Sequence, residues 1–215
     1  MTPLLVTPGG VTLVGGGVTD PGDLALALAH APRLVAADSG ADAALSAGHL
    51  PEWVIGDLDS ISAPARARLA GRLHPVAEQD STDFEKCLQR IVAAHVIAVG
   101  FAGARLDHTL AALSVMARRP GQRILMLTEA EVVFRAPPRL RLDLPPGLLV
   151  SLFPMGPVRG RSTGLVWPIE GLDFAPDARV GTSNASTGPV ALEVEGAMLV
   201  MLPKAALPAV LAALH

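Results

Sequence analysis

The stretch Val54-Ile55-Gly56-Asp57-Leu58-Asp59-Ser60 decides how the first half of the chain is interpreted. A short apolar run ends here in two carboxylates. If the run is a buried strand, the alternation of side chains places Asp57 and Asp59 on one side of the chain. Two like charges close together are costly, and a hard cation such as Mg²⁺ would relieve the repulsion. A polar turn after a strand would have the same composition, so the neighbouring segments must decide.

Apolar strands and helices alternate through the first half of the chain. Strands are predicted at 11–14, 33–37, 53–56, 73–77 and 96–100, and helices at about 21–30, 40–48, 64–70, 84–92 and 108–117. This order predicts an α/β fold with a doubly wound, mainly parallel sheet (Rossmann-like), covered by helices on both faces. Ligands of such sheets bind at the carboxyl ends of the strands.

The unusual residues fall in the turns that follow these strands. They are Gly15 to Gly17, Asp38, Asp57 with Asp59, residues 79–83, and Arg105 with Asp107. Thr82 and Glu85 form a capping box, and Asp83 beside them is expected to face the first two carboxylates. Arg105 precedes a helix, where the dipole disfavours a cation, and its fork matches phosphate oxygens. Two alternatives stay open: Asp107 is the N-cap of that helix, or it pairs with Arg105.

Composition excludes several classes of protein. The net charge is −3, aromatic residues make up 3% and tyrosine is absent, so no nucleic-acid surface is expected. The single cysteine, Cys87, excludes an internal disulfide and fits a reducing cytoplasm. Prolines and glycines interrupt the uncharged residues 2–19, so neither a signal peptide nor a membrane span is expected. An acidic edge with one Arg and one Lys suits a Mg²⁺-bound polyphosphate better than acyl or hydride transfer.

The pattern changes at about Gln122, which predicts domains at 1–121 and 122–215. Strands are expected at 139–144, 148–153, 165–167, 190–194 and 198–202, and a short helix at 205–215. This spacing predicts an antiparallel β-sandwich. Two turns, 162–168 and 182–184, are polar. Trp167 in the first either packs in the core or between domains, or offers a stacking face to a flat heteroaromatic or cationic ligand.

Six segments together resemble the thiamine pyrophosphokinase (thiamine diphosphokinase) family. They are Ala37-Asp-Ser-Gly-Ala41, Gly56-Asp-Leu-Asp-Ser60, Asp80-Ser-Thr-Asp-Phe-Glu-Lys86, Gly103-Ala-Arg-Leu-Asp-His108, Ser162-Thr-Gly-Leu-Val-Trp167 and Thr182-Ser-Asn184. The resemblance implies transfer of diphosphate from ATP to the hydroxyl of thiamine, which gives thiamine diphosphate and AMP. It also implies a homodimer whose active site lies between the α/β domain of one subunit and the sandwich of the other.

The resemblance also implies roles for individual residues. Asp57, Asp59 and Asp83 would hold Mg²⁺ and, with Arg105 and Asp107, form the catalytic set. Gln79, Thr82, Lys86 and Arg105 would contact the phosphates of ATP, and Asp38 and Asp107 would line the cleft. Trp167, with Ser162, Thr163, Ser183 and Asn184, would receive thiamine from the partner subunit.

Four residues depart from the family pattern, namely Ser39, Ala104, Ala112 and Gly181. None of these departures removes a carboxylate or the arginine. Two other functions stay open: a pyrophosphokinase for another alcohol, such as a pterin, and a regulatory module that binds nucleotide or thiamine without turnover. The identity of the base and the choice between one and two metal ions also stay open.

Overall fold

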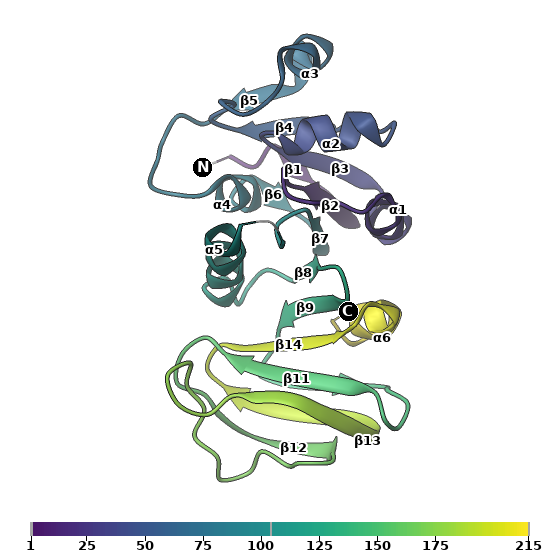
Figure 1. Ribbon diagram of the computed structural model, residues 1–215, viewed down its shortest axis with the longest axis vertical. Coiled ribbons are helices and arrows are strands. Elements are labelled where there is room, and N and C mark those ends of the chain that lie inside the picture. The colour runs from purple at the N-terminus through teal and green to yellow at the C-terminus, as the bar shows by residue number, and fades with distance from the viewer. Residues whose placement is uncertain (1, 104, 215) are drawn as a thin grey trace. The chain divides into compact units, whose positions relative to one another are not determined.

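The computed structural model describes residues 2–103 and 105–214 and divides the chain into two compact units (Figure 1). Unit 1 comprises Met1–Val115 and Ile124–Glu129, and unit 2 comprises Met116–Arg123 and Ala130–His215. The chain therefore passes from unit 1 to unit 2, returns for one short segment, and leaves again.

A parallel sheet forms the centre of unit 1. Its strands, in spatial order, are β8 (Ile124–Leu127), β7 (His95–Val99), β2 (Gly10–Val14), β3 (Arg33–Ala37), β4 (Trp53–Gly56) and β5 (Leu73–Pro75). Every neighbouring pair is parallel. All residues of β2 and β7 are buried. This burial explains why both strands are mainly apolar, although each also contains one buried polar residue, Thr12 in β2 and His95 in β7.

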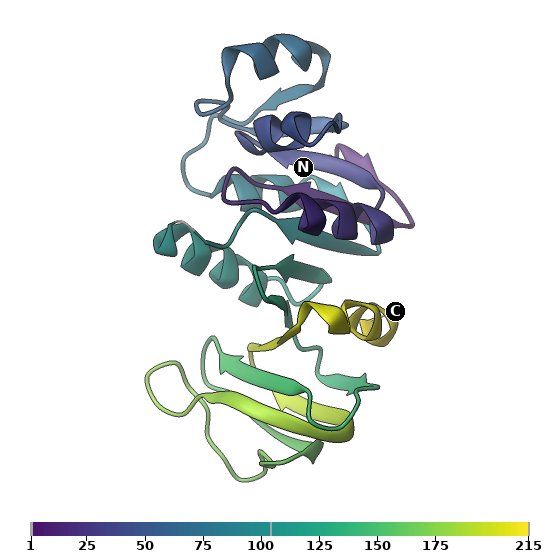
Figure 2. The ribbon, with the colours of Figure 1, turned by 45° about the vertical axis from the view of Figure 1, so that its right-hand side comes forward.

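Helices cover both faces of this sheet. They are α1 (Pro21–His30), α2 (Gly40–Ser46), α3 (Ala63–Arg68), α4 (Asp83–Leu88) and α5 (Leu106–Ala117), with a 3₁₀ turn, η1, at Ala70–Arg72. α1 and α2 lie on one face and α4 on the other, as the two views agree (Figures 1 and 2). The parallel α/β arrangement predicted from the alternation is present. Among the described residues, no helix is long and apolar enough to cross a membrane.

Helix α4 is shorter than its apolar stripe predicts. It begins at the expected cap, because the Thr82 hydroxyl accepts a hydrogen bond from Glu85 N at 3.3 Å. It ends at Leu88, and Ile91–Val92 form a short strand, β6, that pairs in parallel with β1 (Leu5–Val6). The expected continuation of the helix to Val92 is therefore wrong. Two consecutive β-branched residues favour a strand where a partner strand is available.

Unit 2 is built on antiparallel strands. They are β9 (Glu131–Arg135), β10 (Arg139–Leu142), β11 (Leu149–Pro154), β12 (Arg159–Leu165), β13 (Gly181–Glu195) and β14 (Met198–Pro203), followed by η2 (Lys204–Ala206) and α6 (Leu207–Leu214). β13 pairs with β11 over its first residues and with β10 and β12 over its last. The strand expected at 165–167 is displaced, because β12 ends at Leu165. The expected last residue of the final helix, His215, lies outside the described residues.

A bulge in β12 depends on Gly164. The register between β12 and β13 shifts at this residue, which has φ +79. A Cβ atom at position 164 would lie 2.0 Å from the carbonyl oxygen of Pro189. Gly147 offers a matched comparison, since it has φ +83 but nothing within 4 Å of an added Cβ.

We expect Gly164→Ala to lower the free energy of unfolding more than Gly147→Ala does. Gly147→Ala should cost about 1 kcal/mol, because only the left-handed backbone is penalised. Gly164→Ala should cost about 3 kcal/mol, because backbone overlap adds to that penalty. Urea denaturation of both variants measures the difference, and equal losses would show that the contact with Pro189 is relieved at no cost.

Candidate functional site

A cleft of about 630 Å³ lies in unit 1. It is lined by residues from the turns after β2, β3, β4, β5 and β7, which include Gly16, Gly17, Asp38, Asp57, Asp59, Gln79, Thr82, Asp83 and Arg105. The turns predicted to share one edge of the sheet therefore do meet. The glycine loop, three acidic turns and the arginine face one space.

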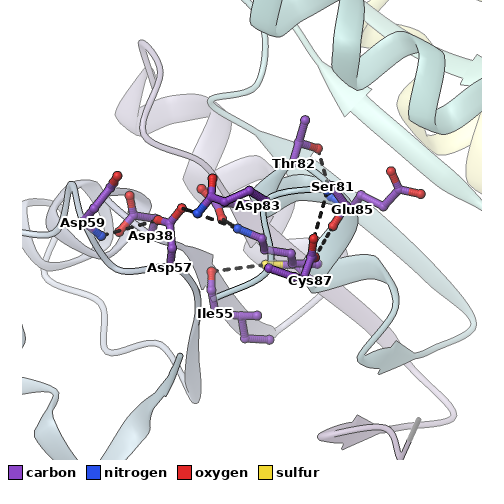
Figure 3. Close-up of polar contacts among 12 residues, drawn as sticks. Asp38, Ile55, Asp57, Asp59, Ser81, Thr82, Asp83, Glu85 and Cys87 are labelled. Atoms are coloured by element: carbon purple, nitrogen blue, oxygen red, sulfur yellow. Dashed lines mark hydrogen bonds and ion pairs between the residues drawn. The ribbon is translucent and has the colours of Figure 1, made fainter. Parts of the chain in front are cut away.

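Three carboxylates form the centre of the cleft (Figure 3). Asp38, Asp57 and Asp59 each offer an oxygen within 4.8 Å of the others. Asp38 Oδ1 is buried, and no group among the described residues forms a hydrogen bond with it. A buried oxygen without a partner is costly, and carboxylate oxygens are the ligands that Mg²⁺ prefers. The residues present therefore fit a hard divalent cation.

Ser60 holds two of these carboxylates in place. Its backbone N–H donates to Asp38 Oδ2 at 3.2 Å, and its hydroxyl donates to Asp59 Oδ1 at 2.8 Å. No separate role for Ser60 follows from the sequence pattern. The feature of the sequence that could have indicated this role is its position directly after the two aspartates, where the chain turns back towards the preceding strand.

The two aspartates after β4 meet through a turn and not through strand alternation. Leu58 between them has φ +63, in the left-handed region, and its side chain is buried. Its carbonyl oxygen accepts a hydrogen bond from the Arg66 guanidinium. A left-handed conformation is strained for a leucine, so burial and this bond must hold it. Asp38, with φ +43, also lies in the left-handed region, which an aspartate tolerates better than a leucine does.

Gly56 allows a fourth carboxylate to approach. A Cβ atom at this position would lie 3.0 Å from Asp83 Oδ1 and 3.1 Å from Asp38 Cβ. Any larger residue would therefore push the start of α4 away from the end of β3. The small residue before the two aspartates is thus what lets Asp83 stand beside Asp38.

Lys86 lies beneath this acidic group. Its Nζ donates to Asp83 Oδ1 at 3.0 Å and lies 3.5 Å from Asp57 Oδ2. Gln79 Nε2 also donates to Asp57 Oδ2, at 3.1 Å. The Lys86 side chain is only 2% exposed and is not among the residues that line the cleft. The structure therefore places the ammonium against two carboxylates, whereas the family resemblance implies a contact with phosphate.

These contacts shift the pKa values of the group in different directions. Burial, followed by the charge of Asp83, raises the pKa of Asp38 above its ordinary value. The hydrogen bond from Gln79 lowers the pKa of Asp57 despite partial burial. Burial lowers the pKa of Lys86, but the hydrogen bond to Asp83 and the surrounding negative charges outweigh it, so that the pKa is raised. Of Asp38 and Asp57, Asp38 is thus the carboxylate less suited to stay ionised without a cation.

Arg105 and Asp107 pair with each other. The Arg105 guanidinium donates to both oxygens of Asp107, at 3.1 and 2.5 Å. Arg105 lines the cleft, whereas Asp107 does not. Asp107 is the second residue of α5, so the alternative that it caps this helix is wrong. The Arg105 side chain is 65% exposed, which leaves it able to reach a ligand.

The expected thiamine contacts lie in unit 2. Asn184 is buried and binds the backbone of Trp167 twice, accepting from its N–H at 3.1 Å and donating to its carbonyl at 2.7 Å. The buried Ser162 hydroxyl accepts from Ile169 N at 3.1 Å. Trp167 is 62% exposed, so the alternative that it packs in the core is wrong. Thr163 and Ser183 are also exposed.

The departures from the family pattern fall at different places. Ser39 and Ala112 line the cleft. Gly181 is the first residue of β13. Ala104 lies outside the described residues. Ser39 and Ala112 are therefore the departures that concern ligand contacts within unit 1.

The fold and cleft define an α/β protein whose acidic site lies at the carboxyl ends of a parallel sheet. Residues 24–126 match the family described as "Thiamin pyrophosphokinase, catalytic domain". This match confirms the resemblance to the thiamin pyrophosphokinase family that the motifs indicate.

Individual relatives agree with this assignment. Thiamine pyrophosphokinase 1 of Arabidopsis thaliana is 26% identical over 157 residues, and thiamine pyrophosphokinase 1 of Oryza sativa subsp. japonica is 25% identical. Each alignment covers 62% of this chain, and the chain spans 58% of the length of either plant relative.

Two solved structures share the fold. The thiamin pyrophosphokinase of Geobacillus thermodenitrificans has a TM-score of 0.74 at 22% identity, covering 90% of this chain and 96% of that one. The enzyme of Candida albicans has a TM-score of 0.75 at 14% identity, covering 94% and 95%. The similarity of fold thus extends through both units.

We expect Asp38→Asn to stabilise the protein at pH 7 in the presence of EDTA. Because the pKa of Asp38 is raised on folding, its ionisation opposes folding. This penalty is absent below the unfolded pKa, grows as pH rises from the unfolded to the folded pKa, and is complete above the folded pKa. Asparagine also tolerates the left-handed backbone. Urea midpoints should therefore rise at pH 7 and match the wild type at about pH 3.5.

The exposed Asp143→Asn serves as the control for lost charge, because Asp143 lies outside the cleft. A loss of stability in Asp38→Asn at pH 7 would contradict the expectation. It would mean that the hydrogen bond from Ser60 N–H to the Asp38 carboxylate stabilises the fold by more than the repulsion from neighbouring carboxylates destabilises it.

Proposed function

We propose that the protein is a thiamine pyrophosphokinase, which transfers diphosphate from ATP to the hydroxyl of thiamine and releases AMP. One observation carries the proposal: the segment that matches the family's catalytic domain folds so that its aspartates and Arg105 face a single cleft. Fold alone would not support a reaction. The proposed reaction is supported by the agreement between the position of the site and the segment that matches the family.

Mg²⁺ would be held by Asp57, Asp59 and Asp83, the set implied by the family motifs, with Asp38 joining them. The short distances among Asp38, Asp57 and Asp59 support that addition. When bound, the ion would offset the negative charge of the ATP phosphates. Asp38, which the motifs imply contacts ATP or lines the cleft, would then also be a ligand of the metal.

The chain's own residues would position the reactants. Arg105 would exchange Asp107 for phosphate oxygens, since its fork binds either. Gln79 and Thr82 line the same cleft and would contact phosphates, and Gln79 would also keep Asp57 ionised. Asp107, released from Arg105, would complete the catalytic set.

The reaction would be an in-line displacement at the β-phosphorus. The hydroxyl oxygen of thiamine forms a bond to the β-phosphorus, and the bond from that phosphorus to the oxygen bridging it to the α-phosphorus breaks. AMP leaves with the bridging oxygen, and the hydroxyl proton passes to a carboxylate of the cleft. Holding the hydroxyl against the phosphorus would supply much of the rate.

Thiamine would stack on Trp167, whose exposed indole suits a flat cation. Thr163 and Ser183 would offer hydroxyls beside it, while Ser162 and Asn184 would hold the turn that presents the indole. We further propose that unit 2 is a β-sandwich, that unit 1 is Rossmann-like, and that the catalytic and thiamine-binding roles fall to 1–121 and 122–215. The protein would act in the cytoplasm as a homodimer, with each active site shared between two subunits.

Incubation with ATP, Mg²⁺ and thiamine should yield AMP and thiamine diphosphate in equal amounts. Asp57→Asn should lower the rate by about a hundredfold or more, because a ligand to the metal is lost. The variant should keep the circular dichroism of the wild type. Asp143→Asn, an exposed acidic residue of unit 2, should keep full activity.

The outcomes separate the candidate functions. AMP formation by folded Asp57→Asn at the normal rate would rule out its role with the metal. Faster turnover of a pterin alcohol than of thiamine would favour the other substrate. Tight binding of both ligands without AMP would identify a regulatory module.

We expect Trp167→Ala to raise the KM for thiamine by about tenfold, the size of a lost cation–π contact. The KM for ATP should change little. Val166→Ala is the matched control, because Val166 is also exposed but has no π face. Equal effects of the two variants on the KM for thiamine would argue against stacking.

A further inference from the structure

Lysine is rare in this chain. Only two of its 17 basic residues, Lys86 and Lys204, are lysines. Lys86 is also among the largest side chains that are fully buried. A lysine is almost never buried unless its charge is paired. Its position beneath the acidic cleft therefore calls for an explanation beyond packing.

The first turn of α4 sets the position of Lys86. Asp83 and Lys86 are three residues apart on this helix, so their side chains share one face. The ammonium lies between Oδ1 of Asp83, at 3.0 Å, and Oδ2 of Asp57, at 3.5 Å. Asp83 and Asp57 come from different turns and lie side by side (Figure 3). The ammonium thus bridges two carboxylates of the acidic group.

We propose that Lys86 is a built-in cation that takes the place of a second metal ion between Asp57 and Asp83. Lys86 contacts Oδ2 of Asp57 and Oδ1 of Asp83, so the second oxygen of each carboxylate is not bonded to the ammonium. Lys86 is therefore a positioning residue: it sets which oxygens face the ligand and limits the site to a single divalent ion. The inference rests on the metal site of the proposed function.

The choice of lysine over arginine fits this role. An ammonium is a compact point charge with three donors, whereas a guanidinium is a broad planar fork. The compact group suits a gap whose two carboxylates already lie close to Gly56, where an added Cβ would lie 3.0 Å from Asp83 Oδ1. The chain uses arginine at nearly all its other basic positions, so lysine here is not a general preference.

The charges of the group also require an internal cation. Asp38, Asp57, Asp59 and Asp83 would carry four negative charges in one cleft, and a single divalent ion offsets two of them. Lys86 offsets a third without any ligand bound. Removing one partner of a buried ion pair leaves an uncompensated charge, which is strongly destabilising.

Lys86→Met tests the proposal, with Lys204→Met as the matched control. Methionine fills the path of the lysine stem but ends one atom short of Nζ, so it vacates the cation position. The melting temperature is measured in EDTA and in excess Mg²⁺, without ATP or thiamine, at an ionic strength fixed with KCl. Mn²⁺ titration by calorimetry gives the number of ions bound per chain.

We expect Lys86→Met to have a lower melting temperature than the wild type in EDTA. Mg²⁺ should raise its melting temperature by about twice as much as it raises that of the wild type. It should bind a second Mn²⁺ ion where the wild type binds one. Lys204→Met should behave as the wild type in both measurements. An equal Mg²⁺ shift and equal Mn²⁺ stoichiometry in Lys86→Met and the wild type would overturn the proposal, because a packing role predicts that result.

A double variant covers the case in which Lys86→Met does not fold. Lys86→Met with Asp83→Asn removes one charge of each sign, so the proposal expects folding to return and the extra response to metal to vanish. A double variant that stays unfolded would overturn it. Because no substrate is present, an inactive protein with these metal responses would contradict only the proposed function.

Discussion

Repulsion among like charges is the constraint on which the rest of the cleft depends. Asp38, Asp57, Asp59 and Asp83 meet because the carboxyl ends of parallel strands share one edge of a sheet. Their closeness opposes folding, and Lys86 offsets part of the repulsion through its ion pairs with Asp57 and Asp83. Such local conflict between charge and stability is typical of a site shaped for a ligand.

Much of the fold of unit 1 could be predicted from the sequence, for physical reasons. Its central strands are buried on both faces, so each appears as an apolar run ended by turn residues, and the acidic turns follow directly. The burial of Lys86 and the partnership of Asp38 with Asp57 depend on how separate turns approach in space. A local pattern carries no signal for that approach, and the Thr82 capping box was visible only because all its atoms are local.

Less of the structure of unit 2 could be predicted from the sequence. β13 runs over Gly181–Glu195, yet only its last apolar residues alternate clearly enough to predict a strand. Its first residues are polar and include Asn184, whose amide fixes the backbone of Trp167. That pairing joins residues far apart in sequence, so the exposure of the indole could not be deduced from either turn alone. The apolar runs that form β8 and β9 were missed because short runs do not distinguish strand from helix.

The path of the chain between its two units limits how such proteins can recombine during evolution. Residues 116–123 belong to unit 2, but residues 124–129 return to unit 1 and supply β8. A single recombination point therefore cannot exchange one unit for a homologous unit without splitting the other. Exchange of one whole unit would require more than one crossover, because its segments flank a segment of the other unit.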